Sequence, residues 1–328
     1  MSATIIKPRK YRVQRSELAV PATSEKFFQK AATCDADVIF LDLEDAVAPA
    51  MKVVARKNAI VALKDIDWGQ KTMAVRVNSL DSQWAHRDII DIVSECPRLD
   101  MVLLPKTGTP FDVQFVDTLL TALEREHRRE ERVGLEILIE TALGMAHVEQ
   151  IAASSERLEA MIFGVGDYSI SIQTMTPVFG SPNPRYAVLT DPDASGARVR
   201  HWNDQWHFAL ARIANACRAY GLRPIDGPFT NYGDPDGYRA SAERAAALGF
   251  EGKWAIHPSQ IAIANEVFTP SAHEVAWARK ILEAIEHANT DGKGAFGLEG
   301  VLVDMAHEKM ARNVIQRAKA ASTLEPRS

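Results

Sequence analysis

The sequence predicts a (β/α)8 barrel followed by a helical extension, and three observations support this prediction. Short apolar runs alternate with amphipathic helical stretches along the chain, a pattern that is typical of parallel sheets. Eight such units fit within roughly 250 residues, which matches a closed barrel better than an open doubly wound sheet. No GxGxxG motif follows the first run, so a dinucleotide-binding fold lacks its main support.

The predicted strands are short apolar runs, and we expect them to be buried parallel strands. In chain order they cover residues 17–20, 38–43, 73–77, 101–104, 135–139, 160–163, 223–225 and 253–256. The stretches between them carry apolar residues at helical spacing. The helices predicted from this spacing cover residues 24–33, 53–63, 83–94, 111–128, 206–220 and 237–248. Together these elements predict a catalytic barrel domain over residues 1–270.

Two segments depart from a plain barrel. The first is a polar insertion over residues 174–205, rich in proline and glycine, and loops of this length are often active-site lids or binding loops. The second is an extension over residues 271–328, with predicted helices at about 272–288 and 305–320 around a glycine-containing hinge at 291–294. We expect this extension to dock on its own barrel or on that of a neighbouring subunit.

Bulk composition narrows the class of protein. Of the 328 residues, 46% are hydrophobic and 25% are charged, and the formal charge of -5 argues against a nucleic-acid-binding protein. Cys34, Cys96 and Cys217 are scattered and form no CxxC pair, which indicates reduced thiols in the cytoplasm. The sequence contains no apolar run as long as a membrane span and no signal-peptide core. We therefore expect a cytoplasmic enzyme without membrane or nucleic-acid partners.

Polar residues follow most of the predicted strands. They include Glu44, Asp45, Arg76, Asn78, Lys106, Glu140, Asp167, Asp226 and His257. In parallel α/β folds the carboxyl ends of the strands are where ligands bind and chemistry occurs. A purely structural scaffold has little reason to place charge at so many corresponding positions. This periodic placement indicates an enzyme.

Glu140 and Asp167 each follow one of these strands directly. Carboxylate oxygens are the ligands that a hard divalent ion such as Mg²⁺ prefers, so the two acids are candidate metal ligands. The alternative is that each one caps the helix that follows, because acids are favoured at helix N-termini.

Arg76, at the end of the third strand, is suited to binding a carboxylate with two hydrogen bonds or to stabilising an enolate oxygen. An ion pair with Glu44 or Asp45 is the simpler alternative, and both roles are compatible. We expect Glu44 and Asp45 to hold metal-bound waters and to orient Arg76. His257 is a candidate base, although a hydrogen-bonded histidine at a strand end is the expected state. A metal with an arginine suits chelation of a 2-oxoacid and the making or breaking of a carbon–carbon bond.

Several segments resemble the citrate-lyase β-subunit-like (HpcH/HpaI aldolase) superfamily. They are SELAVP at 16–21, LDLEDAVAP at 41–49, IET at 139–141, FGVGDY at 163–168 and GKWAIHP at 252–258. DGPF at 226–229 and NEVFTPS at 265–271 are most similar to its bacterial L-malyl-CoA/β-methylmalyl-CoA lyases. The resemblance implies a Mg²⁺-dependent lyase, with Mn²⁺ as a substitute. It would reversibly cleave (S)-malyl-CoA to acetyl-CoA and glyoxylate, and β-methylmalyl-CoA to propionyl-CoA and glyoxylate.

The resemblance also implies roles for individual residues. Glu140 and Asp167 would bind the metal, while Arg76 and Asp304 would be catalytic, with Asp304 reaching a neighbouring subunit's site as the acid/base at the acyl carbon. The implied substrate and CoA contacts are Ala19, Ser24, Lys30, Arg76, Gly166, Asp167, Ile256 and His257. A homotrimer, or a hexamer built as a dimer of trimers, is implied as well. The segment 175–181 departs from the family pattern.

Four other functions compete with this interpretation. A malyl-CoA thioesterase or a citramalyl-CoA lyase would use the same scaffold. A 2-oxoacid aldolase that does without CoA is disfavoured by the C-terminal extension. A non-catalytic subunit of a multi-enzyme complex is disfavoured because Arg76, Glu140, Asp167 and Asp304 are all present.

Overall fold

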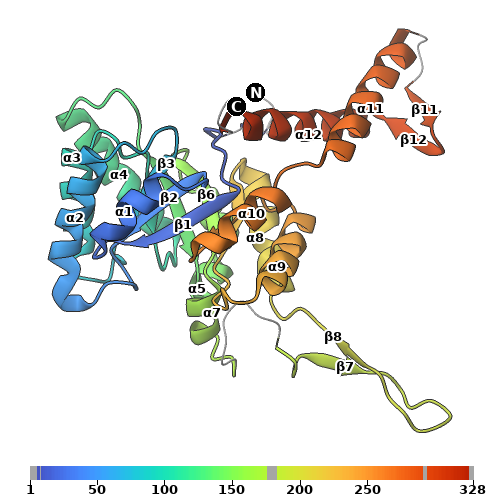
Figure 1. Ribbon diagram of the computed structural model, residues 1–328, viewed down its shortest axis with the longest axis horizontal. Helices are drawn as coiled ribbons and strands as arrows, with labels where there is room; N and C mark the ends of the chain where they lie inside the picture. Colours follow the sequence, from blue (N-terminus) through green and yellow to red (C-terminus); the bar gives the residue numbers. More distant parts are fainter. Residues whose placement is uncertain (1–5, 8, 176–182, 291–293, 325–328) are drawn as a thin grey trace. The chain divides into compact units, whose positions relative to one another are not determined.

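Eight parallel strands close into a barrel in the computed structural model, which describes residues 6–7, 9–175, 183–290 and 294–324 (Figure 1). Around the barrel the strand order is β1-β10-β9-β6-β5-β4-β3-β2. The strands are β1 (Ser16–Pro21), β2 (Val38–Asp42), β3 (Thr72–Arg76), β4 (Met101–Leu104), β5 (Gly134–Ile139), β6 (Leu158–Phe163), β9 (Arg223–Asp226) and β10 (Gly252–Ala255). The predicted fold is confirmed, and each predicted strand lies within one or two residues of an observed one.

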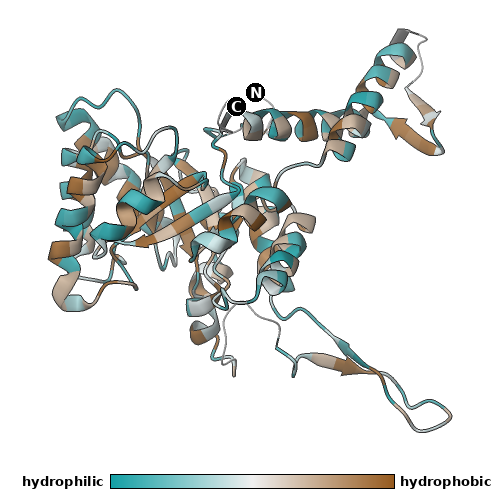
Figure 2. Cartoon of the chain, in the orientation of Figure 1, coloured by the Kyte–Doolittle hydropathy of each residue, from teal (hydrophilic) through white to brown (hydrophobic). Residues whose placement is uncertain are grey.

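Helices cover the outside of the barrel, which is why the strands are apolar on both faces. They are α1 (Glu25–Ala32), α2 (Lys52–Asp65), α3 (Ala85–Glu95), α4 (Pro110–Glu126), α5 (Ala142–Ala146), α6 (Val148–Ala152), α7 (Val165–Ser171), α8 (His207–Tyr220), α9 (Pro235–Ala247) and α10 (Ile261–Val267), with 3₁₀ turns η1 (Pro49–Met51) and η2 (Pro258–Gln260). Figure 2 shows apolar strands beside helices that mix hydrophilic and hydrophobic residues. Local signals set the helix ends: Thr109 and Asp112 form a reciprocal capping box at the start of α4.

Inward-facing side chains fill the barrel in layers, as expected for this fold. An apolar cluster occupies the middle, with Phe40 and Trp254 in tilted ring contact at 4.5 Å. A polar layer lies nearer the N-terminal ends of the strands, where Nε2 of Gln14 donates hydrogen bonds to Glu17 (3.1 Å) and Glu136 (2.5 Å). The C-terminal ends carry a second charged layer, which is the candidate site.

The polar insertion over residues 174–205 is only partly irregular. It contains an antiparallel hairpin of β7 (Ala187–Leu189) and β8 (Arg200–Trp202), which the sequence analysis missed. Residues 176–182 lie outside the described residues, so the departure from the family pattern at 175–181 is not tested. None of the helices in the described ranges combines the length and apolar character that crossing a bilayer requires.

The chain divides into two units, residues 1–265 and 266–328. The second unit contains α11 (Ala272–Thr290), the antiparallel pair β11 (Ala295–Leu298) and β12 (Val301–Asp304), and α12 (Met305–Leu324). It has its own small core, in which Ile281, Ile285 and Val303 are buried. The predicted helices of the extension are confirmed, and residues 291–293 of the expected hinge lie outside the described residues.

Candidate active site

Glu140 follows β5 and is 2% exposed at the C-terminal end of the barrel. Its Oε1 accepts a hydrogen bond of 2.7 Å from the backbone N–H of Lys106. Burial raises the pKa of Glu140 to about 8, and the nearby charges of Asp167 and Glu44 act in the same direction. The guanidinium of Arg76 opposes this shift, and a divalent cation bound here would also favour the charged carboxylate.

Asp167 lies in the first turn of α7, after β6. Its pKa is also raised, chiefly by burial, although Lys106 opposes the shift. No group of three or more His, Cys, Asp or Glu side chains is arranged as a metal site within the described ranges. The two carboxylates of Glu140 and Asp167 are suited to a hard cation such as Mg²⁺, which takes one or two protein carboxylates and completes its shell with substrate and water oxygens.

Arg76 ends β3 and is locked by three acids from the β2 segment. Its Nε and Nη2 each donate a 2.7 Å hydrogen bond to Asp42, in a two-pronged pair. Its Nη1 lies 3.1 Å from Glu44 and 3.6 Å from Asp45. Burial alone would lower the pKa of Arg76, but the three carboxylates raise it above its ordinary value. The guanidinium is therefore a fixed positive charge beside the two candidate metal ligands.

Glu44 and Asp45 also meet a lysine. Nζ of Lys106 forms an ion pair with Glu44, and it lies 3.3 Å from Asp45 and 3.9 Å from Asp167. Burial raises the pKa of Glu44 to about 7, whereas Arg76 and Lys106 hold the pKa of Asp45 below its ordinary value in spite of burial. The backbone of this loop is supported by the buried Lys52, whose Nζ donates to the carbonyl oxygens of Leu43 (2.9 Å) and Glu44 (2.7 Å).

The residues implied in CoA binding lie on different elements of the barrel unit. Ala19 is on β1 and packs against the interior apolar cluster, Ser24 directly precedes α1, and the exposed Lys30 is in its last turn. Gly166 is in the first turn of α7, beside Asp167.

Ile256 and His257 follow β10. Nδ1 of His257 lies 2.8 Å from the hydroxyl oxygen of Ser259, and its ring stacks on Tyr232 with centroids 4.9 Å apart. His257 is therefore the hydrogen-bonded histidine that was expected. Its predicted contact with CoA stays a prediction.

Asp304 belongs to the second unit and ends β12, directly before α12. Its Oδ1 accepts hydrogen bonds from the backbone N–H of Ala306 (2.9 Å) and His307 (3.4 Å) and contacts Nδ1 of His307 at 2.8 Å. These hydrogen bonds lower the pKa of Asp304. Within the chain Asp304 therefore caps a helix, and its action in a neighbouring subunit's site stays a prediction.

Three residues of the site were given no individual role from the sequence. Asp42 is the main partner of Arg76, because the parallel register of β2 and β3 places the two residues side by side. Lys106 connects four of the acids by its side chain and backbone. Gly164, after β6, leaves the space that Glu140 fills. The only available signals were the third acid in the LDLED segment, the polar residue after the fourth strand and a glycine before Asp167.

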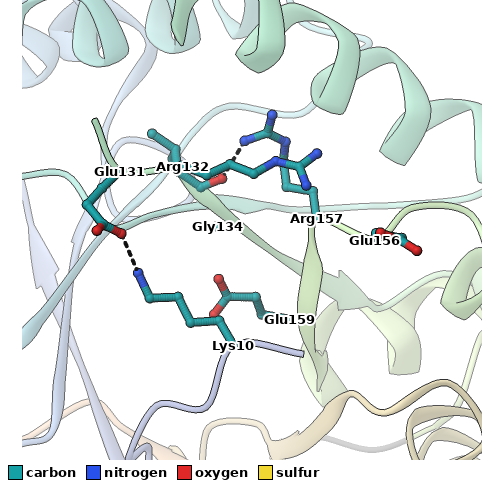
Figure 3. A pocket seen from close by; sticks show the side chains of 8 residues that line it. Lys10, Glu131, Arg132, Gly134, Glu156, Arg157 and Glu159 are labelled. Atoms are coloured by element: carbon teal, nitrogen blue, oxygen red, sulfur yellow. Dashed lines mark hydrogen bonds and ion pairs between the residues drawn. The ribbon is translucent and has the colours of Figure 1, made fainter. Parts of the chain in front are cut away.

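A cavity of about 190 Å³ lies away from this site (Figure 3). Gly134 and Glu159, near the starts of β5 and β6, line it, so it belongs to the N-terminal end of the barrel. Figure 3 shows Lys10 reaching toward Glu131, and the two side chains lie 3.1 Å apart. Arg157, which also lines the cavity, pairs with Glu124 at 2.5 Å. Because charges at this end of the fold serve stability, we assign these pairs a structural role.

The fold is that of a β/α-barrel enzyme, and the C-terminal ends of its strands carry two carboxylates suited to a divalent cation beside a fixed arginine. The chain belongs to the HpcH/HpaI aldolase/citrate lyase family, whose family model matches residues 15–258.

The chain is 45% identical to an L-malyl-CoA/β-methylmalyl-CoA lyase of Rhodobacter capsulatus, over 96% of this chain and 97% of the relative. It is 34% identical to a (3S)-malyl-CoA thioesterase of Cereibacter sphaeroides, over 93% of this chain and 95% of the relative. Among solved structures it is similar to CitE from Mycobacterium tuberculosis in complex with magnesium, acetoacetate and coenzyme A. That likeness has a TM-score of 0.70 at 28% identity, and it covers 94% of this chain and 98% of the other.

Proposed function

We propose that the protein is a Mg²⁺-dependent carbon–carbon lyase that cleaves (S)-malyl-CoA to acetyl-CoA and glyoxylate, and β-methylmalyl-CoA to propionyl-CoA and glyoxylate, reversibly. The observation that carries the proposal is the juxtaposition of the pair Glu140 and Asp167 with the locked guanidinium of Arg76. The 45% identity to a lyase with this pair of substrates supports it over nearly the whole length of both chains.

The chain's own residues supply the rest of the chemistry. A bound Mg²⁺, held by Glu140 and Asp167, would polarise the carbonyl group of the 2-oxoacid. Arg76 is fixed by Asp42 before substrate arrives, so its charge needs no reorganisation to stabilise the oxygen on which negative charge develops. Glu44 and Asp45 would accept hydrogen bonds from waters on a bound ion, and Asp304 of a neighbouring subunit would exchange the proton at the acyl carbon.

Family membership also supports a proposal for the substrate contacts, the alternative metal ion and the oligomeric state. The substrate is an acyl-CoA thioester, and its contacts are Ala19, Ser24, Lys30, Gly166, Ile256 and His257. Mn²⁺ replaces Mg²⁺, because both ions accept octahedral oxygen ligands. The active form is a homotrimer or a dimer of trimers in the cytoplasm.

Malyl-CoA thioesterase activity is the second candidate, because the thioesterase of Cereibacter sphaeroides is 34% identical over most of the chain. The two activities differ in their products. A lyase releases glyoxylate together with an acyl-CoA, whereas a thioesterase releases free CoA together with the intact hydroxy acid.

The test is a steady-state assay with malyl-CoA, β-methylmalyl-CoA and citramalyl-CoA, in which glyoxylate and free CoA are followed separately. We expect Mg²⁺-dependent glyoxylate formation from the first two substrates without matching release of free CoA. Glu140→Ala and Asp167→Ala should each abolish this activity and leave the far-UV circular dichroism spectrum unchanged, because each removes one of two protein ligands.

The matched control is Glu131→Ala, which removes a surface carboxylate at the other end of the barrel and should leave turnover unchanged. Release of free CoA without glyoxylate would make the protein a thioesterase. Near-normal turnover of Glu140→Ala or Asp167→Ala at ordinary Mg²⁺ would remove the metal assignment.

A further inference from the structure

Lys106 adopts a backbone conformation that few residues with a side chain adopt. It follows β4 after Pro105, and its φ of 52° lies in the left-handed region. This region is unfavourable for a residue other than glycine, so the surrounding structure must hold the backbone there. The result is that the backbone N–H points to Glu140 at 2.7 Å while the side chain reaches Glu44 on another strand's loop.

The side chain of Lys106 connects opposite sides of the site. Its ammonium contacts Glu44 and Asp45, which follow β2, and also Asp167, which follows β6. The side chain is 31% exposed, so it is only partly covered by the surrounding residues. Lys106 is thus placed between the candidate metal ligands and the two acids beside Arg76.

Lys106 reduces an excess of negative charge at the site. Arg76 makes its two-pronged pair with Asp42, so these two charges offset each other. Four carboxylates then remain: Glu44, Asp45, Glu140 and Asp167. A divalent ion would offset two of these charges and Lys106 one more, so the site stays negative even with Lys106. Besides Arg76, Lys106 is the basic residue among the described ones that forms ion pairs with Glu44 and Asp45.

We propose that Lys106 is a positioning and specificity-determining residue that admits the anionic 2-oxoacid to the site. The inference rests on the proposed function for the identity of that anion. Without Lys106, the carboxylate of the oxoacid would approach Glu44 and Asp45 with no ammonium beside them. Repulsion between neighbouring negative charges is strong in a partly buried site. The ion is not repelled by these acids, so loss of Lys106 weakens oxoacid binding and spares ion binding.

The experiment measures binding, not turnover. Mg²⁺ alone, and then oxalate in saturating Mg²⁺ as an unreactive analogue of the oxoacid, are titrated into the full-length protein by calorimetry. For Lys106→Met we expect Mg²⁺ to bind as tightly as to the wild type or more tightly, and oxalate to bind about tenfold to a hundredfold more weakly. In the lyase assay the loss should appear mainly in KM for glyoxylate in the condensation direction.

Companion variants separate the side chain from the backbone. Lys106→Arg keeps the charge and should restore most of the oxalate affinity, whereas Lys106→Gly accepts the left-handed conformation but lacks the ammonium and should behave like Lys106→Met. If Lys106→Gly binds oxalate like the wild type, the backbone matters and the proposal is wrong. Lys10→Met, which breaks a lysine–glutamate pair at the other end of the barrel, is the control and should bind both ligands normally.

Two further outcomes overturn the proposal: oxalate affinity unchanged in Lys106→Met, or Mg²⁺ affinity reduced as much as oxalate affinity. The second would mean that Lys106 only supports the metal ligands. A wild-type protein that binds oxalate with Mg²⁺ but produces no glyoxylate would overturn the proposed lyase function and leave the assignment of Lys106 intact.

Discussion

A β-carbon on Gly164 would lie 2.4 Å from Cβ of Glu140 and 2.3 Å from its Oε2. The absence of a side chain after β6 is therefore what allows the carboxylate after β5 to occupy its position. Glu140 itself is buried and has little room to move aside. The geometry of the candidate metal site thus depends on a residue that cannot bind metal.

Gly164→Ala should weaken Mg²⁺ binding by about tenfold to a hundredfold, the range seen when residues that orient a metal ligand are changed. Calorimetric titration with Mg²⁺ measures the effect, and the circular dichroism spectrum should stay that of the wild type. Gly233→Ala is the control, because a β-carbon there meets its nearest atom at 3.6 Å, an ordinary contact. Unchanged Mg²⁺ affinity in Gly164→Ala would show that Glu140 is not a ligand or has another position when the ion is bound.

Arg76→Lys should lower kcat by about 10²–10³, by analogy with the loss of one donor to a developing oxyanion. Lysine keeps the charge but cannot reproduce the two parallel hydrogen bonds to Asp42. Arg157→Lys is the control, since Arg157 makes comparable buried pairs with Asp117 and Glu124 outside the site. Both variants should lose stability in thermal unfolding, but only Arg76→Lys should lose turnover. Near-wild-type kcat in Arg76→Lys would leave Arg76 as an ion-pair partner alone.

Mixing two inactive variants tests whether Asp304 acts in a neighbouring subunit. Asp304→Ala subunits retain the metal ligands, and Glu140→Ala subunits retain the aspartate. If Asp304 acts across a subunit boundary, mixed oligomers regain activity, because some sites combine both intact groups. The experiment needs verified subunit exchange, for example by mass spectrometry of differently tagged subunits. No recovery would leave Asp304 as the cap of α12 that its hydrogen bonds describe, where its loss costs roughly 1 kcal/mol.

Glu136 should make the stability of the barrel depend on pH. Burial raises its pKa from 4.5 to about 7, and burial together with the charge of Glu136 raises the pKa of Glu17 well above its usual range. A carboxyl group whose pKa is raised in the folded state favours folding in its protonated form. Its stabilising contribution is complete below about pH 4.5 and is lost as the pH rises through about 7.

Glu136→Gln replaces the carboxyl group with a neutral amide of the same shape. The free energy of unfolding, measured in denaturant at about pH 5 and about pH 8, should fall with pH less steeply for this variant than for the wild type. Glu131→Gln changes a surface carboxylate and should retain the wild-type slope. Equal slopes for Glu136→Gln and the wild type would contradict the prediction.

Much of the site was predictable because it depends on local sequence. A strand in a parallel barrel is recognisable as an apolar run, and the residue that follows it lies at the C-terminal end of the barrel whatever its neighbours are. Glu140, Asp167 and Arg76 were identified from this rule alone. The resemblance of motifs such as FGVGDY to a family added the substrate class, which periodicity and spacing do not contain.

Which residues meet across strands was decided by the tertiary structure. The register of β2 and β3 places Asp42 beside Arg76. Both residues are buried, so of the three acids near Arg76 it is Asp42 that holds the guanidinium in place. Lys106 contacts both sides of the site because its backbone is in the left-handed region. Nothing in the neighbouring sequence predicts that conformation. Register, barrel closure and steric exclusion act between residues far apart in the chain. The sequence therefore determined which groups stand at the ends of the strands, and the fold determined which of them touch.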